Sequence, residues 1–242
     1  MRRIFGIMAV TCLTSLSTIA QTTEGFFLSK EGAKMEYTET LGAIAKYISE
    51  DYTYQTKEVT KIKLQEDGTT SVIIKHLTLD KNKKPSKLFN KKGFFTATEV
   101  FPDGSYTIGP LFFEVGTDNL ISTTGYSLKI PIELQVGDSI ESGISTCSSK
   151  GQYKITSTKT CYNFNVTEEC DLTTPAGTFH CYVIKGNTKI DVQVKSGSVT
   201  NNSIGETTEE YWIAKGIGVV RYKVYNAEAK LSRQIELTSL SM

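Results

Sequence analysis

The side chains with acid–base chemistry that stand out first are the two histidines, His76 and His180. A hairpin at the sequence Thr-Pro-Ala-Gly-Thr would bring His180 to face Asp171, in the arrangement of a base held by a carboxylate. A catalytic dyad also needs a nucleophile, and the sequence has no G-x-S-x-G turn. A solvated cross-strand pair is therefore favoured for His180, and a position on a strand face for His76, so no catalytic residue is assigned.

Two acidic pairs, Glu168-Glu169 and Glu209-Glu210, invite comparison with the two carboxylates of glycoside hydrolases. Adjacent residues of a strand point to opposite faces, so neither pair can act as a neighbouring dyad. One carboxylate of each pair could still face a cleft with a partner from elsewhere. A hydrolase is the third and least favoured class of function.

Lysines crowd one predicted loop. They could attract a phosphate, a lipid head group or an acidic glycan, although a solvated loop that resists aggregation is favoured. The residues are Lys81, Lys83, Lys84, Lys87, Lys91 and Lys92.

Four cysteines lie within one 35-residue stretch: Cys147, Cys161, Cys170 and Cys181. In an oxidising compartment an even number of such thiols predicts two disulfides. A zinc site is the rival interpretation, but the spacing offers no C-x-x-C and no histidine at ligand distance in the sequence. We expect no metal site and no cofactor.

The turn at Pro175-Ala176-Gly177 decides how two of these cysteines would pair. A two-residue loop places Cys170 directly across from Cys181, whereas a three-residue loop with a bulge at Gly177 makes the pair diagonal and strained. We favour a Cys170–Cys181 disulfide, which leaves Cys147–Cys161 by default.

The elements that position these side chains are predicted to be strands almost throughout. Hydrophobic residues alternate with polar ones in segments such as 220–225 and 231–238, which is typical of strands with one buried face. About ten antiparallel strands are expected, with a long and less regular connection over residues 108–136 that contains a short strand or helix. Turn residues separate the runs, at Glu66-Asp67-Gly68, Pro102-Asp103-Gly104, Gly186-Asn187 and Lys215-Gly216, among others.

The hydrophobic alternation changes phase inside one long strand. Ile155 and Ser157 occupy odd positions, whereas Tyr162, Phe164 and Val166 occupy even ones. Because a one-residue slip exchanges the two faces, a bulge or break is predicted near residues 159–161. A bulged long strand curves its sheet. The predicted fold class is all-β, with a single strongly curved antiparallel sheet forming an incomplete barrel, similar to the half-barrel of lipoprotein carriers, or a sandwich.

Composition and charge exclude several classes of protein. Of the 242 residues, 39% are hydrophobic and 22% are charged, with 27 Lys and Arg against 26 Asp and Glu. These values argue against a disordered chain and against a dedicated nucleic-acid-binding protein. No nucleic-acid partner is expected.

The first residues predict an export signal. Arg2 and Arg3 precede a mainly apolar run from Ile4 to Leu16, and Ala20 ends a sequence suited to signal peptidase. We expect residues 1–20 to be a cleaved signal peptide and residues 21–242 to form a single β-rich domain, located in the periplasm or secreted. No membrane span is expected after cleavage.

Three segments, in this order, resemble the TapB-like family of uncharacterised exported bacterial proteins: Lys30-Glu31-Gly32-Ala33-Lys34, Thr173-Thr174-Pro175-Ala176-Gly177-Thr178-Phe179-His180-Cys181-Tyr182, and Tyr211-Trp212 with Gly216 and Gly218. The resemblance spans most of the chain after residue 20, and it implies an exported, β-rich, curved half-open barrel without an agreed activity. It carries over no catalytic residue. Cys147, Cys161 and Cys170 depart from the family pattern.

Two classes of function remain open from the sequence. One is a binding or carrier module for an apolar or amphipathic ligand, such as a lipid or cell-envelope component, held in the concavity of the sheet. The other is a structural or surface-interaction protein without a small ligand. The phase of each strand nominates inward-facing residues that either line a cavity or pack as core: Phe164, Val166, Phe179, Val183, Val220, Tyr222, Ile235 and Leu237.

Overall fold

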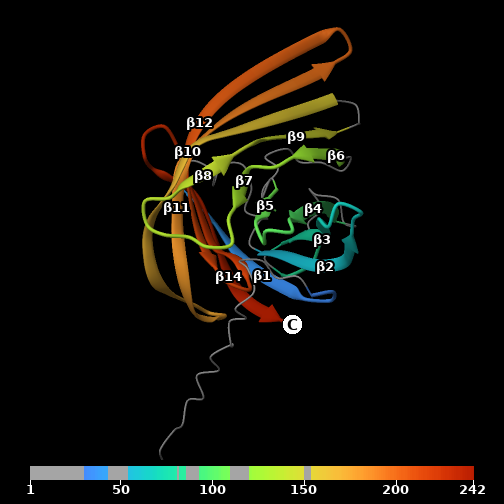
Figure 1. The fold of residues 1–242 in the computed structure, drawn as a ribbon. Coiled ribbons are helices and arrows are strands. Elements are labelled where there is room, and N and C mark those ends of the chain that lie inside the picture. Colours follow the sequence, from blue (N-terminus) through green and yellow to red (C-terminus); the bar gives the residue numbers. More distant parts are fainter. Residues whose placement is uncertain (1–29, 43–53, 81, 86–92, 110–119, 150–153) are drawn as a thin grey trace, which may run out of the picture.

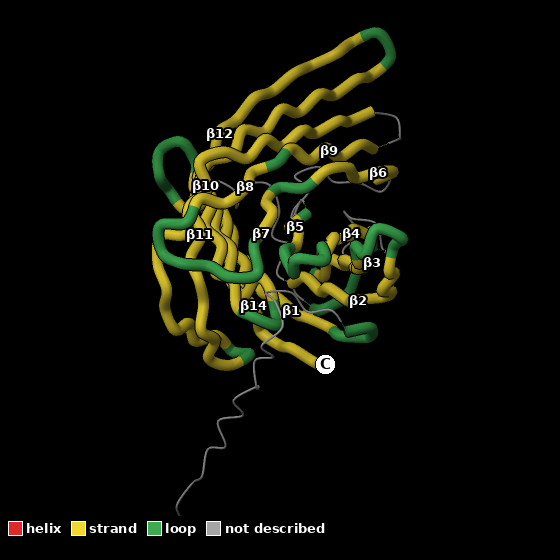
Figure 2. Tube along the Cα trace, viewed as in Figure 1, coloured by secondary structure: helices red, strands yellow, loops and turns green. Residues whose placement is uncertain are grey.

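The computed structural model describes residues 30–42, 54–80, 82–85, 93–109, 120–149 and 154–242. Within these ranges the regular elements are all strands, as Figures 1 and 2 show. The described part of the chain has no helix that is long and apolar enough to cross a membrane. The strands are β1 (Lys34–Leu41), β2 (Tyr54–Leu64), β3 (Thr70–Leu79), β4 (Phe94–Val100), β5 (Tyr106–Ile108), β6 (Leu120–Gly125), β7 (Leu128–Ile130), β8 (Ser139–Ser142), β9 (Ile144–Ser149), β10 (Lys154–Thr174), β11 (Gly177–Ser196), β12 (Val199–Ala214), β13 (Gly218–Tyr225) and β14 (Leu231–Ser241).

The predicted all-β fold is confirmed, and the alternation of side chains explains why these segments are strands. In β13, Val220, Tyr222 and Val224 are buried while the residues between them are partly exposed. A strand with this period buries one face and leaves the other in contact with water.

The strands form one antiparallel sheet that closes into an uneven ring. The order of neighbouring strands is β11-β12-β13-β14-β1-β2-β3-β4-β5-β7-β8-β10. The ring closes because β10 also pairs with β11, the first strand of this order. On one side of the ring, neighbouring strands pair over only one or two residues. β4 pairs with β5 at Val100 and Tyr106, and β8 pairs with β10 around Ile140 and Phe164. By contrast, β10 and β11 pair along nearly their whole length. Beyond the ring, the outer parts of β10, β11 and β12 project together with β9 and β6 (Figure 1).

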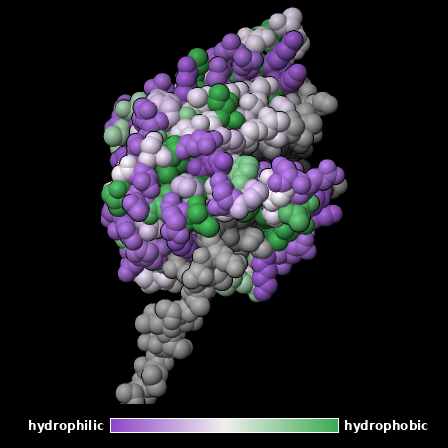
Figure 3. All heavy atoms as spheres, in the orientation of Figure 1, coloured by the Kyte–Doolittle hydropathy of each residue, from purple (hydrophilic) through white to green (hydrophobic). Residues whose placement is uncertain are grey.

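The core lies inside the ring and is rich in aromatic side chains. Figure 3 shows mostly hydrophilic residues on the face in view, with small separate hydrophobic patches. The largest fully buried apolar residues are Tyr37, Tyr106, Tyr211, Phe164, Phe179, Leu128, Ile130, Ile184, Ile213 and Leu237.

The predicted change of phase in β10 exists, but it lies farther along the strand than residues 159–161. Its pairing with β11 shifts between Tyr162 and Asn165, and Asn163 has a φ of 56°. Asparagine tolerates this left-handed conformation better than most residues. Tyr162 therefore precedes the bulge and is only half-buried, whereas Phe164 after it points fully into the core.

The turn predicted at Gly186-Asn187 was wrong, because both residues lie inside β11. Gly186 is required there for a packing reason. A Cβ on Gly186 would lie 2.4 Å from Cγ of Phe164, so the glycine leaves the space that the Phe164 ring fills. A close approach of this kind is a recognised use of glycine within a strand.

The irregular region expected at residues 108–136 contains more strand than predicted. β6 and β7 lie within it, although each is short. Residues 110–119 of this region lie outside the described part of the chain.

Candidate ligand-binding site

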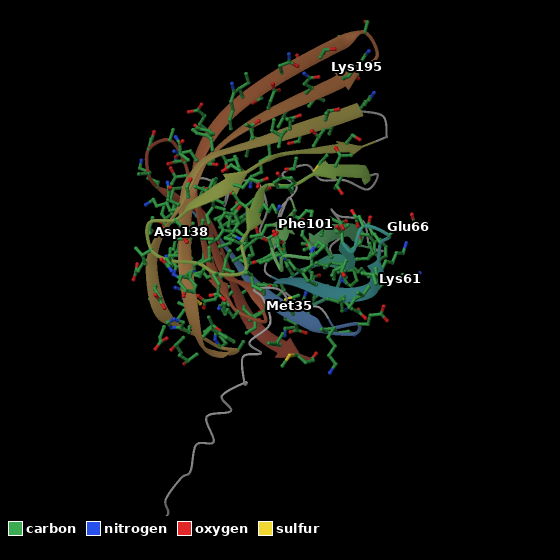
Figure 4. All side chains as sticks on the ribbon, viewed as in Figure 1. Met35, Lys61, Glu66, Phe101, Asp138 and Lys195 are labelled. Atoms are coloured by element: carbon green, nitrogen blue, oxygen red, sulfur yellow. The ribbon has the colours of Figure 1, made fainter. Side chains whose placement is uncertain are left out.

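A pocket opens on the inner face of β1 to β5, next to the turn that joins β12 and β13. Strand pairing explains how its wall is built. Met35 of β1 lies opposite Lys57 of β2, which in turn lies opposite His76 of β3. Residues that face each other across an antiparallel pair point to the same side of the sheet, so these three side chains form one row. In Figure 4, Met35 marks this row on β1, whereas Lys61 lies farther along β2, at the periphery.

A second row continues the wall of the pocket. Ile74 of β3 lies opposite Thr96 of β4, and Thr98 comes two residues later on the same face of β4. The lining is apolar with a few polar groups, which is the usual make-up of a small-molecule site. The complete lining is Met35, Tyr37, Lys57, Ile74, His76, Thr96, Thr98, Tyr106, Thr107, Ile108, Gly109, Ile217, Gly218 and Val219.

The pocket is partly open to solvent. Its empty space totals about 490 Å³, including the open part, and the room in which a water-sized sphere fits is about 40 Å³. The latter room is enough for roughly three water molecules, or for a small polar group of similar size.

Lys57 is the charged residue of this wall. Its side chain is buried, with 6% of the residue exposed, and its Nζ lies 4.8 Å from the centre of the Tyr37 ring. The negative face of an aromatic ring attracts an ammonium group. Burial lowers the pKa of Lys57 to about 8, so the side chain is still mostly protonated at pH 7.

His76 contributes hydrogen bonding to the pocket but no charge. Its Nε2 lies 2.7 Å from the hydroxyl oxygen of Thr96. Burial, and then the neighbouring charge of Lys57, hold the pKa of His76 well below its usual value. The imidazole is therefore neutral at physiological pH, and Lys57 supplies the positive charge of this row.

Tyr37 connects the pocket wall on β1 to the segment after the β12–β13 turn by a hydrogen bond. Its hydroxyl donates a hydrogen bond to the carbonyl oxygen of Val219, at 3.0 Å. Burial raises the pKa of both Tyr37 and Tyr106, the second tyrosine of the lining, so both stay neutral. Ile217, Gly218 and Val219, at the junction of the β12–β13 turn with β13, thus form one side of the pocket.

The residues nominated from the sequence lie elsewhere in the ring. Phe164, Val166, Phe179, Val220 and Tyr222 are buried in the main apolar core, and Val183 is buried outside that cluster. None of the six lines the pocket. Ile235 and Leu237 are also core residues.

Sequence reasoning missed Lys57 as a site residue, although a signal for it existed. Lys57 and Val59 are two residues apart in β2, so both point to its buried face. Ile74 and His76 are related in the same way in β3. A lysine on a buried face is uncommon enough to mark a functional candidate. The register that places Lys57 beside Met35 cannot be deduced from this pattern, because it depends on a strand distant in sequence.

The four cysteines are free thiols in the structure. Cys170 and Cys181 lie directly opposite each other, and the loop between their strands is the two-residue form, Pro175-Ala176. Cys147 lies opposite Ser157 on β10, four residues from Cys161. That separation is about 13 Å along a strand, and Cα atoms more than about 7 Å apart cannot be bridged without moving the backbone. The default pairing Cys147–Cys161 does not fit this register.

His180 faces Asp171 across the hairpin, as expected. Its two ring nitrogens lie 3.0 Å from Asp171 and 2.7 Å from Glu169, in an exposed cluster. These hydrogen bonds, that to Asp171 first, raise the pKa of His180. Both nitrogens are engaged by carboxylates on an open surface, which suits a solvated cross-strand cluster.

Of the two acidic pairs, Glu168 and Glu169 are both exposed, whereas Glu209 and Glu210 separate as strand geometry requires. Glu209 is buried and contacts Lys159 at 2.8 Å, while Tyr211 donates a hydrogen bond to Glu209 at 2.6 Å. Its neighbour Glu210 accepts a hydrogen bond from Tyr225 on the other face of the sheet. The group around Glu209 adjoins the core aromatics, not the pocket.

Of the lysines in the predicted cluster, Lys83 and Lys84 are described and exposed. Lys83 lies 3.6 Å from Glu36 and above the ring of Tyr54. Lys81, Lys87, Lys91 and Lys92 lie outside the described residues. Among the described residues no group of His, Cys, Asp and Glu side chains is arranged to hold a metal ion.

Two solved structures share this fold. One is described as "a putative exported protein with YmcC-like fold" from Bacteroides fragilis, with a TM-score of 0.64 and 16% identity, over 90% of this chain and 100% of the other. The second is described as "a putative lipoprotein" from Parabacteroides distasonis, with a TM-score of 0.65 and 14% identity, over 91% of this chain and 100% of the other.

Sequence comparison identifies the family. No curated protein matches the sequence. The model of the family described as DUF3108-like matches residues 30–237, which include β1 to β13 and the first part of β14. The chain therefore belongs to the DUF3108-like family.

Proposed function

We propose that the protein is a binding or carrier module of the bacterial cell envelope that holds an amphipathic ligand in the pocket between β1 to β5 and the β12–β13 turn. The observation that carries the proposal is the pocket itself. Its apolar wall, with a few polar groups gathered on Lys57, His76 and the threonines, suits a ligand with one apolar and one polar end.

The export signal and the structural neighbours support a location in the envelope. The predicted signal peptide at residues 1–20 directs export into the periplasm or beyond. The similar structures carry the descriptions of an exported protein and a lipoprotein. The three motifs that resemble the TapB-like family point to the same compartment, and we propose that relationship within the DUF3108-like family.

Native mass spectrometry of protein purified from its host tests the proposal. The expected result is a protein mass accompanied by a noncovalent adduct of lipid size, which disappears on denaturation. A bare protein mass, together with no binding when amphiphiles of ten to sixteen carbons are added, would contradict it.

A surface-interaction protein is the second candidate, and the free edge of β12 favours it. Residues 199–207 of β12 pair with β11 on one side, while pairing with β13 begins only at Thr208. Ile204 on this segment is exposed. An unpaired edge can accept a strand from another protein. Self-association that Ile204→Lys abolishes, measured by analytical ultracentrifugation, would support this function, and a monomer at high concentration would count against it.

A further inference from the structure

The free edge of β12 lacks the features that usually keep a strand edge from pairing with another molecule. Residues 199–207 pair with β11 without a register shift, and among the described strands β13 joins β12 only from Thr208. Natural proteins protect such edges with proline, lysine, a bulge or a very short strand. The sequence of 199–207 contains no proline, lysine or arginine, and Glu206 is its one charged residue. This edge, about 30 Å long at the usual rise of a strand, is therefore ready to pair with a further strand.

The free edge belongs to a sheet of several strands. Ile204 of β12 lies opposite Asp191 of β11, which lies opposite Thr158 of β10. Thr158 lies opposite Thr146 of β9, and β6 continues the sheet beyond β9. We call these strands, where they project beyond the ring in Figure 1, the projecting sheet, and Lys195 in Figure 4 marks its far end on β11. A sheet of three or more strands is stable enough to present a regular edge.

Two exposed apolar side chains lie on this edge. Val199 is 57% exposed and Ile204 is 61% exposed. An odd and an even residue of one strand point to opposite faces, so each face of the edge carries one of them. A strand that pairs with this edge would cover both side chains while its backbone bonds to the outward N–H and C=O groups of β12.

The edge is complementary to a second copy of itself. If two copies pair antiparallel about Ser203, residues 199–207 of one strand face residues 207–199 of the other, so the whole free edge is paired. Glu206 then faces Thr200 of the second copy, whose neighbour on β11 is Lys195. No like charges face each other directly, and an opposite charge lies one strand beyond. Ile204 lies diagonally beside Ile204 of the second copy, within reach of an apolar contact.

Among the described residues, β6 forms the opposite edge of the projecting sheet, and it fits the β12 edge less well. β6 has 6 residues, so pairing with it would leave part of residues 199–207 unpaired. Such a contact joins two different surfaces and would continue from copy to copy as an open chain. Pairing of β12 with β12 joins the same surface twice and closes after two copies.

We propose that the edge formed by residues 199–207 binds a second copy of this chain, with the two β12 strands antiparallel about Ser203 and the two projecting sheets joined into one. The inference rests on the surface-interaction function, the second candidate above, and names its partner. It does not involve the pocket, so the carrier function can hold with or without it.

Sedimentation velocity of the exported protein, from micromolar to millimolar concentration, tests the association. We expect monomer and dimer in a concentration-dependent equilibrium, with no larger species. Ile204→Lys places two ammonium groups near each other across the two-fold axis and should weaken the dimer at least tenfold. The matched control is Ile144→Lys, which lies on the same face of the projecting sheet but on β9 and is 58% exposed. This control should leave the affinity of the dimer within twofold of the parent.

A cross-link at the two-fold axis tests the register. Residues opposite each other across an antiparallel pair have Cα atoms about 4.5–5.5 Å apart, which a disulfide can bridge. Ser203→Cys should therefore give a disulfide-linked dimer under mild oxidation, seen as a band of double mass on a non-reducing gel. The control is Thr200→Cys, which is also exposed but whose two copies would lie about 20 Å apart, too far to cross-link. The parent protein shows the background from its own cysteines.

The outcomes separate this inference from the functions proposed above. A dimer that Ile204→Lys does not weaken, or in which Ser203→Cys cross-links no more than Thr200→Cys, would overturn the β12 pairing and leave self-association through another surface. Species that grow beyond the dimer with concentration would overturn it in favour of an open chain. A monomer at millimolar concentration would contradict both this inference and the surface-interaction function. None of these results bears on the carrier function.

Discussion

Cys170 and Cys181 lie directly opposite each other on β10 and β11, four residue pairs from the Pro175-Ala176 turn. The sequence had left two registers open, and the structure has the one that places the two cysteines face to face. Their thiols are free in the structure, and burial, followed by the neighbouring Cys170, raises the pKa of Cys181.

We predict that these two cysteines form a disulfide in the exported protein. An oxidising compartment favours it, and closing a loop of this length stabilises the folded state by about 2–3 kcal/mol. Peptide mapping without reduction should recover a Cys170–Cys181 cross-link with Cys147 and Cys161 as free thiols. Four free thiols in protein taken from the periplasm, or a cross-link to Cys147, would contradict this prediction.

Gly186→Ala should destabilise the protein by about 1–3 kcal/mol, because its methyl group would overlap the Phe164 ring in a packed core. Replacing Phe164 by leucine in the same chain should recover part of the loss. The control is Gly205→Ala on β12, where an added methyl meets no atom within 4 Å. Urea unfolding measures all three, and equal effects of the two alanine substitutions would show that the packing explanation is wrong.

Lys159→Met should lower the free energy of unfolding by about 3–5 kcal/mol, because it leaves the buried carboxylate of Glu209 without its cation. A double variant that also carries Glu209→Leu should lose less than Lys159→Met alone, since no buried charge remains. Lys230→Met breaks an exposed pair with Glu228 and should cost less than about 1 kcal/mol. A Lys159→Met variant as stable as the parent in urea unfolding would contradict the role given to this pair.

Lys57→Met should be more stable than the parent at pH 7, and its advantage should shrink as the pH rises. The folded-state pKa of Lys57, about 8, lies below the ordinary value of 10.5, so the unfolded chain binds more protons between these values. Stability therefore rises with pH in that window, and the cost of burying the ammonium, about 3 kcal/mol, is relieved. The substitution removes this cost at every pH.

Urea unfolding of both proteins at several values between pH 7 and pH 10.5 measures the difference. Tyrosines and cysteines that titrate in this range are common to both proteins and cancel. Lys61→Met serves as the control, with a difference that does not vary with pH. An unchanging difference for Lys57→Met would mean that Lys57 is not buried as the structure has it.

The strands and the curved sheet could be predicted from the sequence because alternation is a local signal. The period of two in β13 and β14 identified the buried face correctly at Val220, Tyr222 and Leu237. The same reasoning failed at Gly186-Asn187. A Gly-Asn sequence is common in turns, but here the glycine makes room for the ring of Phe164 from another strand. Propensity alone cannot distinguish these two uses of glycine.

The site was harder to predict than the fold, because it depends on register between strands far apart in the chain. Lys57 meets Tyr37 and His76 only through the pairing of β1, β2 and β3. The residues nominated from the sequence were the most apolar ones of each strand, and such residues pack as core. The pocket lies where polar residues take inward positions.

Filling the pocket tests the carrier function most directly. Val219 lines the pocket and is half-buried, so Val219→Trp should occupy the space while leaving the ring intact. The control is Leu64→Trp on the exposed end of β2, where the side chain is 77% exposed. Calorimetric titration with decanoate should give one binding site in the parent and in Leu64→Trp, and an affinity at least tenfold weaker in Val219→Trp. Equal binding by all three folded proteins would contradict the assignment of this pocket as the ligand site.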